Sequence, residues 1–197
     1  MNSSSLIAPA RRLASRRSLI KGAGGATLSA VAISLLAGCD SMAADKPMAA
    51  DPANDVAILN SALGLEYQAI AAYQVGAESG LLQKPVLDLA VQFQGDHKQH
   101  AQLLASTVTK LGGTPVMAKN PADYHFPVET LKTQADVLRF AAGLEKGAAS
   151  AYLGAVPLFA NKDLAKAAAS ILGDETMHWA VLRNAVGENP VPMSFIA

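Results

Sequence analysis

The sequence predicts an all-α protein, a four-helix bundle with a long crossover between the second and third helices. Four segments repeat apolar residues at three- and four-residue spacing, and glycine or proline stands at their ends. A hexapeptide also occurs twice, as GDHKQH at 95–100 and GDETMH at 173–178. Each copy lies within a predicted helix, where residues three apart lie on the same side. Glu175 and His178 are therefore expected to face the interior together, a geometry that suits a metal in a four-helix bundle.

Composition is consistent with one domain that has a sizeable core. The chain has 197 residues, of which 51% are hydrophobic and 16% charged. Formal net charge is zero, but five basic residues and no acidic residue precede Cys39, which leaves the rest of the chain acidic. The remainder lacks the basic patch that a nucleic-acid partner would need.

The first 38 residues have the features of an export signal. Residues 15–21, SRRSLIK, resemble the twin-arginine consensus through Arg16 and Arg17, and 22–37 form an apolar run of small residues. An arginine pair before an apolar run also occurs in signals of the general secretory route. The serine and lysine that flank the pair favour the twin-arginine export machinery as a partner.

Residues 36–39, LAGC, resemble a bacterial lipobox, in which cleavage leaves a lipidated cysteine at the new N-terminus. Cys39 would then tether the protein to a membrane, on the periplasmic or cell-surface side, and 39–52 would be the lipidated cysteine with a flexible linker. The alternative is a small-residue cleavage site with an incidental cysteine. Because Cys39 is the only cysteine, no intramolecular disulfide can form.

The bundle is predicted over 53–187. The first helix begins near Asp51-Pro52 and ends before Gly80, with Glu66 as the one polar residue on its apolar stripe. The second helix is predicted from Pro85 to Leu111, with His97 and His100 in its stripe.

Residues 112–129 carry three prolines and no periodicity, which suits a crossover that runs the length of a bundle. The third helix is predicted to begin near Thr130 or Thr133, to carry Glu145, and to kink or end at Pro157. The fourth helix begins at 161–163, carries Glu175 and His178, and stops at Gly187, which leaves a tail at 188–197.

The two halves of the bundle repeat one another. A Gly-Leu-Glu triplet ends at Glu66 and again at Glu145, a tyrosine follows seven residues later in each case, and the hexapeptides come at nearly the same distance. Two pseudosymmetric hairpins would bring six ionisable groups to one level. A buried, unpaired carboxylate costs several kcal/mol, so shared metal cations explain this set best. The set comprises Glu66, His97, His100, Glu145, Glu175 and His178.

Over 53–187 the chain resembles the ferritin-like superfamily of di-iron carboxylate proteins, and within it the exported ferritin-like domain proteins of bacteria. This resemblance implies a glutamate on each of two helices, Glu66 and Glu145, and a Glu-x-x-His pair on each of the other two. Glu175 with His178 fits the pair, whereas His97 stands where the other glutamate should be. A dinuclear site with iron is favoured. A single metal ion is the alternative, as is manganese, zinc or copper in place of iron, because imidazole suits all of them.

Residues beside these ligands carry further expectations. By the resemblance, Asp96 and Asp174 hold ligand histidines through the second ring nitrogen; the alternative is a solvated aspartate. Tyr73 and Tyr152 are expected to pack in the core toward a bundle end; the alternative is a redox role.

Two functions are compatible with this pattern. The resemblance implies a metal-binding protein that oxidises ferrous iron or consumes peroxide. The alternative is a non-catalytic, lipid-tethered bundle that acts as an envelope stress or partner-binding module with a degraded metal site, which the histidine at position 97 favours.

Overall fold

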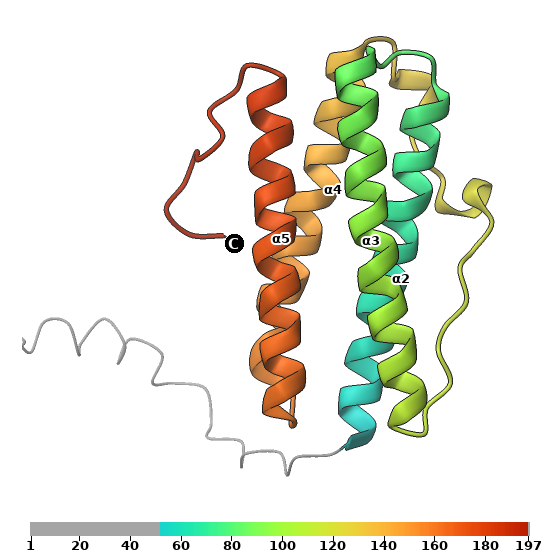
Figure 1. The fold of residues 1–197 in the computed structure, drawn as a ribbon, viewed down its shortest axis with the longest axis vertical. Helices are drawn as coiled ribbons and strands as arrows, with labels where there is room; N and C mark the ends of the chain where they lie inside the picture. Colours follow the sequence, from blue (N-terminus) through green and yellow to red (C-terminus); the bar gives the residue numbers. More distant parts are fainter. Residues whose placement is uncertain (1–51, 197) are drawn as a thin grey trace, which may run out of the picture. The chain divides into compact units, whose positions relative to one another are not determined.

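The computed structural model describes residues 52–196, which form four long helices: α2 (Pro52–Glu78), α3 (Lys84–Lys110), α4 (Gln134–Ala155) and α5 (Lys162–Ala185) (Figure 1). No strand occurs among these residues, and none of their helices is long and apolar enough to cross a membrane. The predicted export signal, with Arg16, Arg17, Cys39 and nearly all of the linker, lies outside the described residues.

The helices pack as two antiparallel hairpins. α2 packs along α3, α4 packs along α5, and α2 also contacts α4. The predicted crossover is confirmed: after α3 the chain returns along the outside of the bundle before α4 begins (Figure 1). It contains two short 3₁₀ turns, η2 (Pro121–Tyr124) and η3 (Val128–Thr130). The side chain of Asn60 ties it to α2 by donating to Thr114 O at 3.0 Å and accepting from Val116 N at 2.9 Å.

Local signals account for most helix ends. Thr133 begins α4 through a capping box, in which its hydroxyl accepts from the backbone N of Asp136 and the Asp136 carboxylate accepts from the backbone N of Thr133. The short turn η4 (Val156–Leu158), which contains Pro157, ends α4. Asn161 caps α5, and Gly187 adopts a φ of 76° just after its end.

Both predicted ends of the second helix were wrong by a residue, and α3 begins at Lys84 rather than Pro85. α3 stops at Lys110, and Leu111 is its C-cap with 38% of its surface exposed, so this leucine does not belong to the buried stripe. A residue past the last helical turn no longer follows the helical periodicity, which explains the difference.

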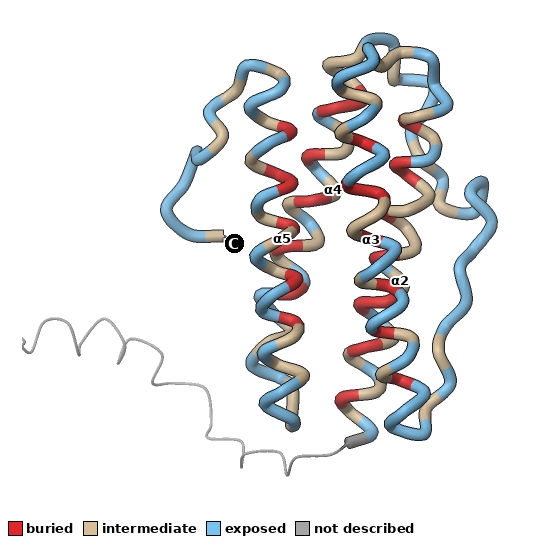
Figure 2. The backbone as a smooth tube through the Cα atoms, in the orientation of Figure 1, coloured by how far each residue is buried: buried red, intermediate tan, exposed pale blue. Residues whose placement is uncertain are grey.

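The core consists of two apolar clusters, and the predicted polar positions come between them along the helices. One cluster is built on Leu59, Leu63, Leu104 and Ile171, and the other on residues that include Phe93, Leu138, Trp179 and Leu182. Figure 2 shows the buried residues on the sides of the helices that face inward.

The C-terminal tail turns back beside α5 (Figure 1). Glu188 anchors it by ion pairs of 2.9 Å to both Arg139 and Arg183, and Ile196 packs against the second cluster.

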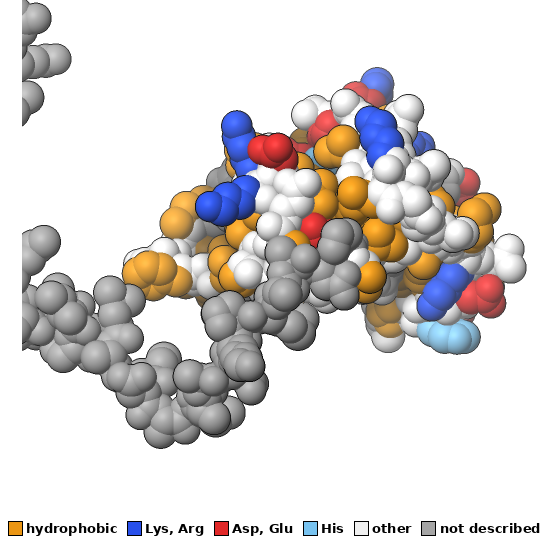
Figure 3. All heavy atoms as spheres, turned by 90° about the horizontal axis from the view of Figure 1, so that it is seen from below, with side chains coloured by type: hydrophobic (Ala, Val, Ile, Leu, Met, Phe, Trp, Pro, Cys, Tyr) orange, Lys and Arg blue, Asp and Glu red, His pale blue; other side chains and the backbone are white. Residues whose placement is uncertain are grey.

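Viewed along the bundle from below, the surface carries scattered hydrophobic side chains and charged side chains of both signs (Figure 3).

Candidate metal centre

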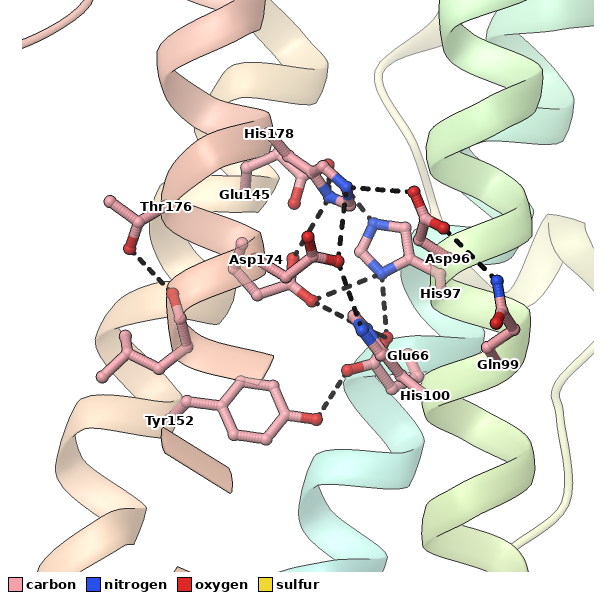
Figure 4. A network of polar contacts seen from close by, with 12 residues as sticks. Glu66, Asp96, His97, Gln99, His100, Glu145, Tyr152, Asp174, Thr176 and His178 are labelled. Atoms are coloured by element: carbon pink, nitrogen blue, oxygen red, sulfur yellow. Dashed lines mark hydrogen bonds and ion pairs between the residues drawn. The ribbon is translucent and has the colours of Figure 1, made fainter. Parts of the chain in front are cut away.

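Six side chains from all four helices meet in the middle of the bundle (Figure 4). Five of them are at most 3% exposed, and the His100 side chain is 15% exposed. α2 supplies one residue, α4 one, and α3 and α5 two each. The structure thus brings together every residue predicted as a ligand: Glu66, His97, His100, Glu145, Glu175 and His178.

These side chains form two overlapping groups that could each hold a metal ion. Within a group, one ligand atom from each residue lies within 4.8 Å of all the others. Both groups contain His97 and Glu175. The first group also contains Glu66 and His100, and the second also contains Glu145 and His178. Each group therefore offers two carboxylates and two imidazoles, a set that suits iron, zinc and copper.

His97 lies between the two lone glutamates. Its Nδ1 is 2.8 Å from Glu66 Oε2, and its Nε2 is 3.3 Å from Glu145 Oε1. Position 97 is on the inward face of α3, 1% exposed, because it follows the buried Phe93 by one helical turn. The Phe93 ring also stacks on His178 with a centroid distance of 3.9 Å, which restricts that imidazole.

The two aspartates of the repeated hexapeptide contact the outer nitrogens of the other two histidines. Asp174 Oδ2 is 3.3 Å from His100 Nε2 and 3.5 Å from His178 Nε2, and Asp96 Oδ2 is 3.5 Å from His178 Nε2. The Nδ1 atoms of both histidines face the buried carboxylates instead, with His100 Nδ1 at 3.2 Å from Glu175 Oε1. This arrangement matches aspartates that orient ligand histidines, and at about 30% exposure both also remain in contact with water.

Both tyrosines pack in the core as predicted, Tyr152 in one apolar cluster and Tyr73 in the other, and each also contacts a candidate ligand. The Tyr152 hydroxyl donates to Glu66 Oε1 at 2.6 Å, and the Tyr73 hydroxyl donates to Glu145 Oε1. Each tyrosine therefore holds the lone glutamate of the opposite hairpin. The sequence did carry a signal for these tyrosines, because each follows a glutamate by seven residues in both halves. That spacing puts the tyrosine on the same helix as the glutamate before it, and so it does not identify the glutamate that the tyrosine contacts across the bundle.

Electrostatics couple these groups tightly. Burial opposes ionisation of Glu66 and Glu145, but hydrogen bonds from histidines outweigh it and hold the pKa of both carboxyls below the usual range. Burial raises the pKa of Glu175 to about 8. Burial also opposes charge on the histidines, yet their carboxylate partners raise the pKa of His97 to about 11 and that of His100 to about 9. These shifts favour the ionised forms of Glu66 and Glu145, the protonated forms of His97 and His100, and the neutral form of Glu175.

Burial and carboxylate neighbours also raise the pKa values of both tyrosines. Desolvation is the largest cause for each, followed by the charge of Glu145 beside Tyr73 and of Glu66 beside Tyr152. Both hydroxyls therefore stay protonated and act as hydrogen-bond donors. The two glutamates use these bonds differently. Glu66 accepts from Tyr152 at Oε1 and turns Oε2 toward His97, whereas Glu145 Oε1 both accepts from Tyr73 and faces His97.

Five buried atoms of this centre make no hydrogen bond within the described residues, although His100 Nδ1 and Glu175 Oε1 lie 3.2 Å apart. They are His100 Nδ1, His178 Nδ1, Glu145 Oε2 and both carboxylate oxygens of Glu175. An unsatisfied buried polar atom costs about 1–3 kcal/mol, so five in one place are not expected in a native site without a further binding partner. All five belong to the two ligand groups and are of the types that metal cations bind, so these residues fit a metal centre.

The fold and the site can now be compared with known proteins. A ferritin-like domain family model matches residues 54–188. Among solved structures, a conserved hypothetical protein from Mycobacterium tuberculosis shows 23% identity and a TM-score of 0.62, covering 73% of this chain and 97% of that one. A ferritin-like, diiron-carboxylate protein from Bacillus anthracis shows 23% identity and a TM-score of 0.59, covering 71% and 99%.

A third solved structure, the dodecameric thioferritin from Bacteroides fragilis, shows 24% identity and a TM-score of 0.60, covering 71% of this chain and 88% of that one. No curated protein matches the sequence significantly. Identities this low support similarity of fold alone, whereas the family match spans the whole four-helix bundle. The chain therefore belongs to the ferritin-like domain family.

Proposed function

We propose that this protein holds two metal ions, with iron as the favoured metal, between its four helices and uses them to oxidise ferrous iron or to consume peroxide. The observation that carries the proposal is the convergence of five unsatisfied, buried ligand atoms within two overlapping donor groups. The diiron-carboxylate protein among its structural neighbours supports iron as the first metal to test.

Bound redox-active ions would supply the electron transfer, and the protein would supply ligands, charge and exclusion of water. Glu66 and Glu145 stay ionised and stabilise positive charge in the interior. Tyr73 and Tyr152 orient these carboxylates, and apolar clusters on both sides keep bulk water out. Removing water strengthens the electrostatic interactions between the carboxylates and a cation.

The outer edge of the centre could manage protons and access. Asp96 and Asp174 are each about 30% exposed and touch the histidine nitrogens that point away from the buried carboxylates. They can fix these histidines with Nδ1 free to bind, and they connect the centre with solvent. Cations would meet negative charge at this edge before reaching the buried ligands.

Export and anchoring belong to the same proposal. The twin-arginine pair Arg16-Arg17 and the lipobox-like Cys39 support a protein that is exported folded and held by lipid on the periplasmic or cell-surface side of a membrane. Twin-arginine export of a folded protein agrees with metal loading before translocation. The acidic character of the chain after Cys39 gives no support for nucleic acid as a partner.

Metal analysis tests the proposal directly. The full chain is purified after native export, and its metal content is compared with that of a Glu175→Ala/His178→Ala double variant. We expect about two metal ions per wild-type chain and a large loss in the variant. A metal-free wild-type protein, with a melting temperature that iron, manganese and zinc all leave unchanged, would instead favour the non-catalytic envelope module.

Activity is measured on the iron-loaded protein. Ferrous iron oxidation and peroxide consumption are followed separately, with the double variant as the negative control and a Lys84→Ala variant as the matched control. Within the described part of the chain Lys84 pairs with Asp88 alone, on the exposed surface of α3, so its loss should not alter either rate. Equal rates in the wild type and the double variant would contradict a catalytic role for this centre.

A further inference from the structure

His97 has contacts unlike those of the other two buried histidines. His100 and His178 each direct one nitrogen to the buried carboxylates and the other to an aspartate at the edge of the site. No aspartate in residues 52–196 contacts His97 in this way: both of its nitrogens face glutamates that are themselves candidate ligands. Resting on the metal-binding function proposed above, we propose that His97 bridges two metal ions, one bound at Nδ1 and the other at Nε2.

The neighbours of each His97 nitrogen divide into two sets. Near Nδ1 lie Glu66 Oε2 at 2.8 Å and Glu175 Oε1 at 3.6 Å. Near Nε2 lies Glu145 Oε1 at 3.3 Å. Glu66 and Glu145 come from different hairpins, so the ring separates the carboxylate of one half from the carboxylate of the other.

Glu175 is divided in the same way. Its Oε1 is 3.2 Å from His100 Nδ1, on the Glu66 side, and its Oε2 is 3.9 Å from His178 Nδ1, on the Glu145 side. Both shared residues therefore turn one ligand atom to each group. The result is two matched donor sets, each with its own glutamate and histidine and one atom from each shared residue.

Bridging changes the protonation of the ring. In the metal-free protein both His97 nitrogens lie within hydrogen-bond distance of a glutamate oxygen. Binding one ion at each nitrogen requires every ring N–H proton to leave for solvent, and the charge of the two cations stabilises the resulting imidazolate. No electron transfer and no other reactant is needed for this step.

A bridging ring also keeps the ions apart. Two-metal sites with direct oxygen bridges place their metals about 3.5–4 Å apart, whereas an imidazole inserts its own width between them. This centre should therefore favour ions that accept imidazole ligands. Magnetic coupling between the two ions would pass through the imidazole ring of His97 and not through a bridging carboxylate.

Copper(II) alone is the probe for this bridge. Metal-free full-length protein is loaded with Cu²⁺, bound copper is counted by mass spectrometry, and unpaired spins are counted by electron paramagnetic resonance at liquid-helium temperature. We expect two copper ions per chain and loss of most of the resonance intensity, because the two electron spins pair through the imidazolate. Replacing one copper with zinc should restore one full spin per chain.

His97→Gln is the test variant and His125→Gln the matched control, since His125 is exposed on the crossover. We expect every copper ion that the His97 variant binds to contribute a full spin, and the control to behave as wild type. If His97→Gln fails to fold, His97→Glu is the second test variant, because it places a carboxylate where the imidazole was. X-ray absorption of the metal-loaded His97→Glu variant should then show a metal–metal distance of about 3.5–4 Å that the wild type lacks.

The outcomes separate this inference from the proposed function. Two bound copper ions with two full spins in the wild type would overturn the bridge and leave metal binding intact, and one copper ion per chain would also overturn it. Absence of copper, iron and zinc binding would overturn both. Loss of spin intensity in the wild type and control, but not in His97→Gln, supports the bridge.

Discussion

Removal of the Tyr152 hydroxyl should destabilise the metal-free protein far more than removal of a hydroxyl at the surface. Tyr152→Phe keeps the ring and its packing but removes the 2.6 Å hydrogen bond to Glu66 Oε1, where both side chains are 2% exposed. A hydrogen bond to a charged group contributes about 1.5–3 kcal/mol, and the ionised Glu66 cannot turn to water instead. For a domain of this size the loss corresponds to about 3–12 °C in melting temperature.

A bound cation should reduce this effect. With its charge compensated by a metal, Glu66 depends less on the tyrosine, and the loss should approach the value for an ordinary hydrogen bond, about 0.5–1.5 kcal/mol. Melting followed by circular dichroism, with a chelator and with added metal, measures both values. Tyr67→Phe is the control, because Tyr67 is also partly buried on the bundle but its hydroxyl has no hydrogen-bond partner among the described residues.

Equal melting temperatures for the Tyr152 and Tyr67 variants in chelator would refute the reasoning, because the buried contact with Glu66 would then contribute nothing. The same substitution at Tyr73, whose hydroxyl donates to Glu145, provides a second test on the other half of the pseudosymmetric pair. We expect a loss of similar size there.

The remaining predictions concern chelation, pH and the N-terminus. A strong chelator should lower the melting temperature of the purified protein, because ligands that bind the native state stabilise it by mass action; no change would indicate protonated or hydrogen-bonded glutamates. Metal-free protein should lose stability from neutral to alkaline pH in urea unfolding. Folding raises the pKa of Glu175 from 4.5 to about 8, that of His100 from 6.5 to about 9 and that of His97 from 6.5 to about 11. The folded state therefore holds protons that the unfolded state has already lost, and rising pH removes them. Metal affinity should rise over the same range, since binding displaces those protons; affinity independent of pH would contradict this charge balance. Cys39→Ser should move the protein out of the membrane fraction, and retention there would disprove lipidation at that residue.

Local patterns in the sequence were sufficient to predict the helices. Helical periodicity depends on neighbouring residues, and capping and breaking residues such as Thr133, Asn161 and Gly187 act within one turn. The burial of the six candidate ligands was also predictable, because an ionisable residue on an apolar stripe is conspicuous and the two halves of the chain repeat.

The partners of those residues were not predictable. That Tyr152 reaches Glu66, and Tyr73 reaches Glu145, depends on how two hairpins pack, which no spacing within one helix encodes. Whether Asp96 and Asp174 meet water or histidine likewise required the distance between α3 and α5.

By itself, the sequence determined the fold class, the helix positions and which residues face the interior, since all three follow from short-range periodicity. Tertiary structure alone decided which atom of each ligand meets which neighbour. His97 shows the difference: its position in the stripe predicted a buried histidine, but only the packing of four helices placed its two nitrogens against two different glutamates. Contact between atoms on separate helices depends on their relative placement, which arises only when the apolar faces pack together.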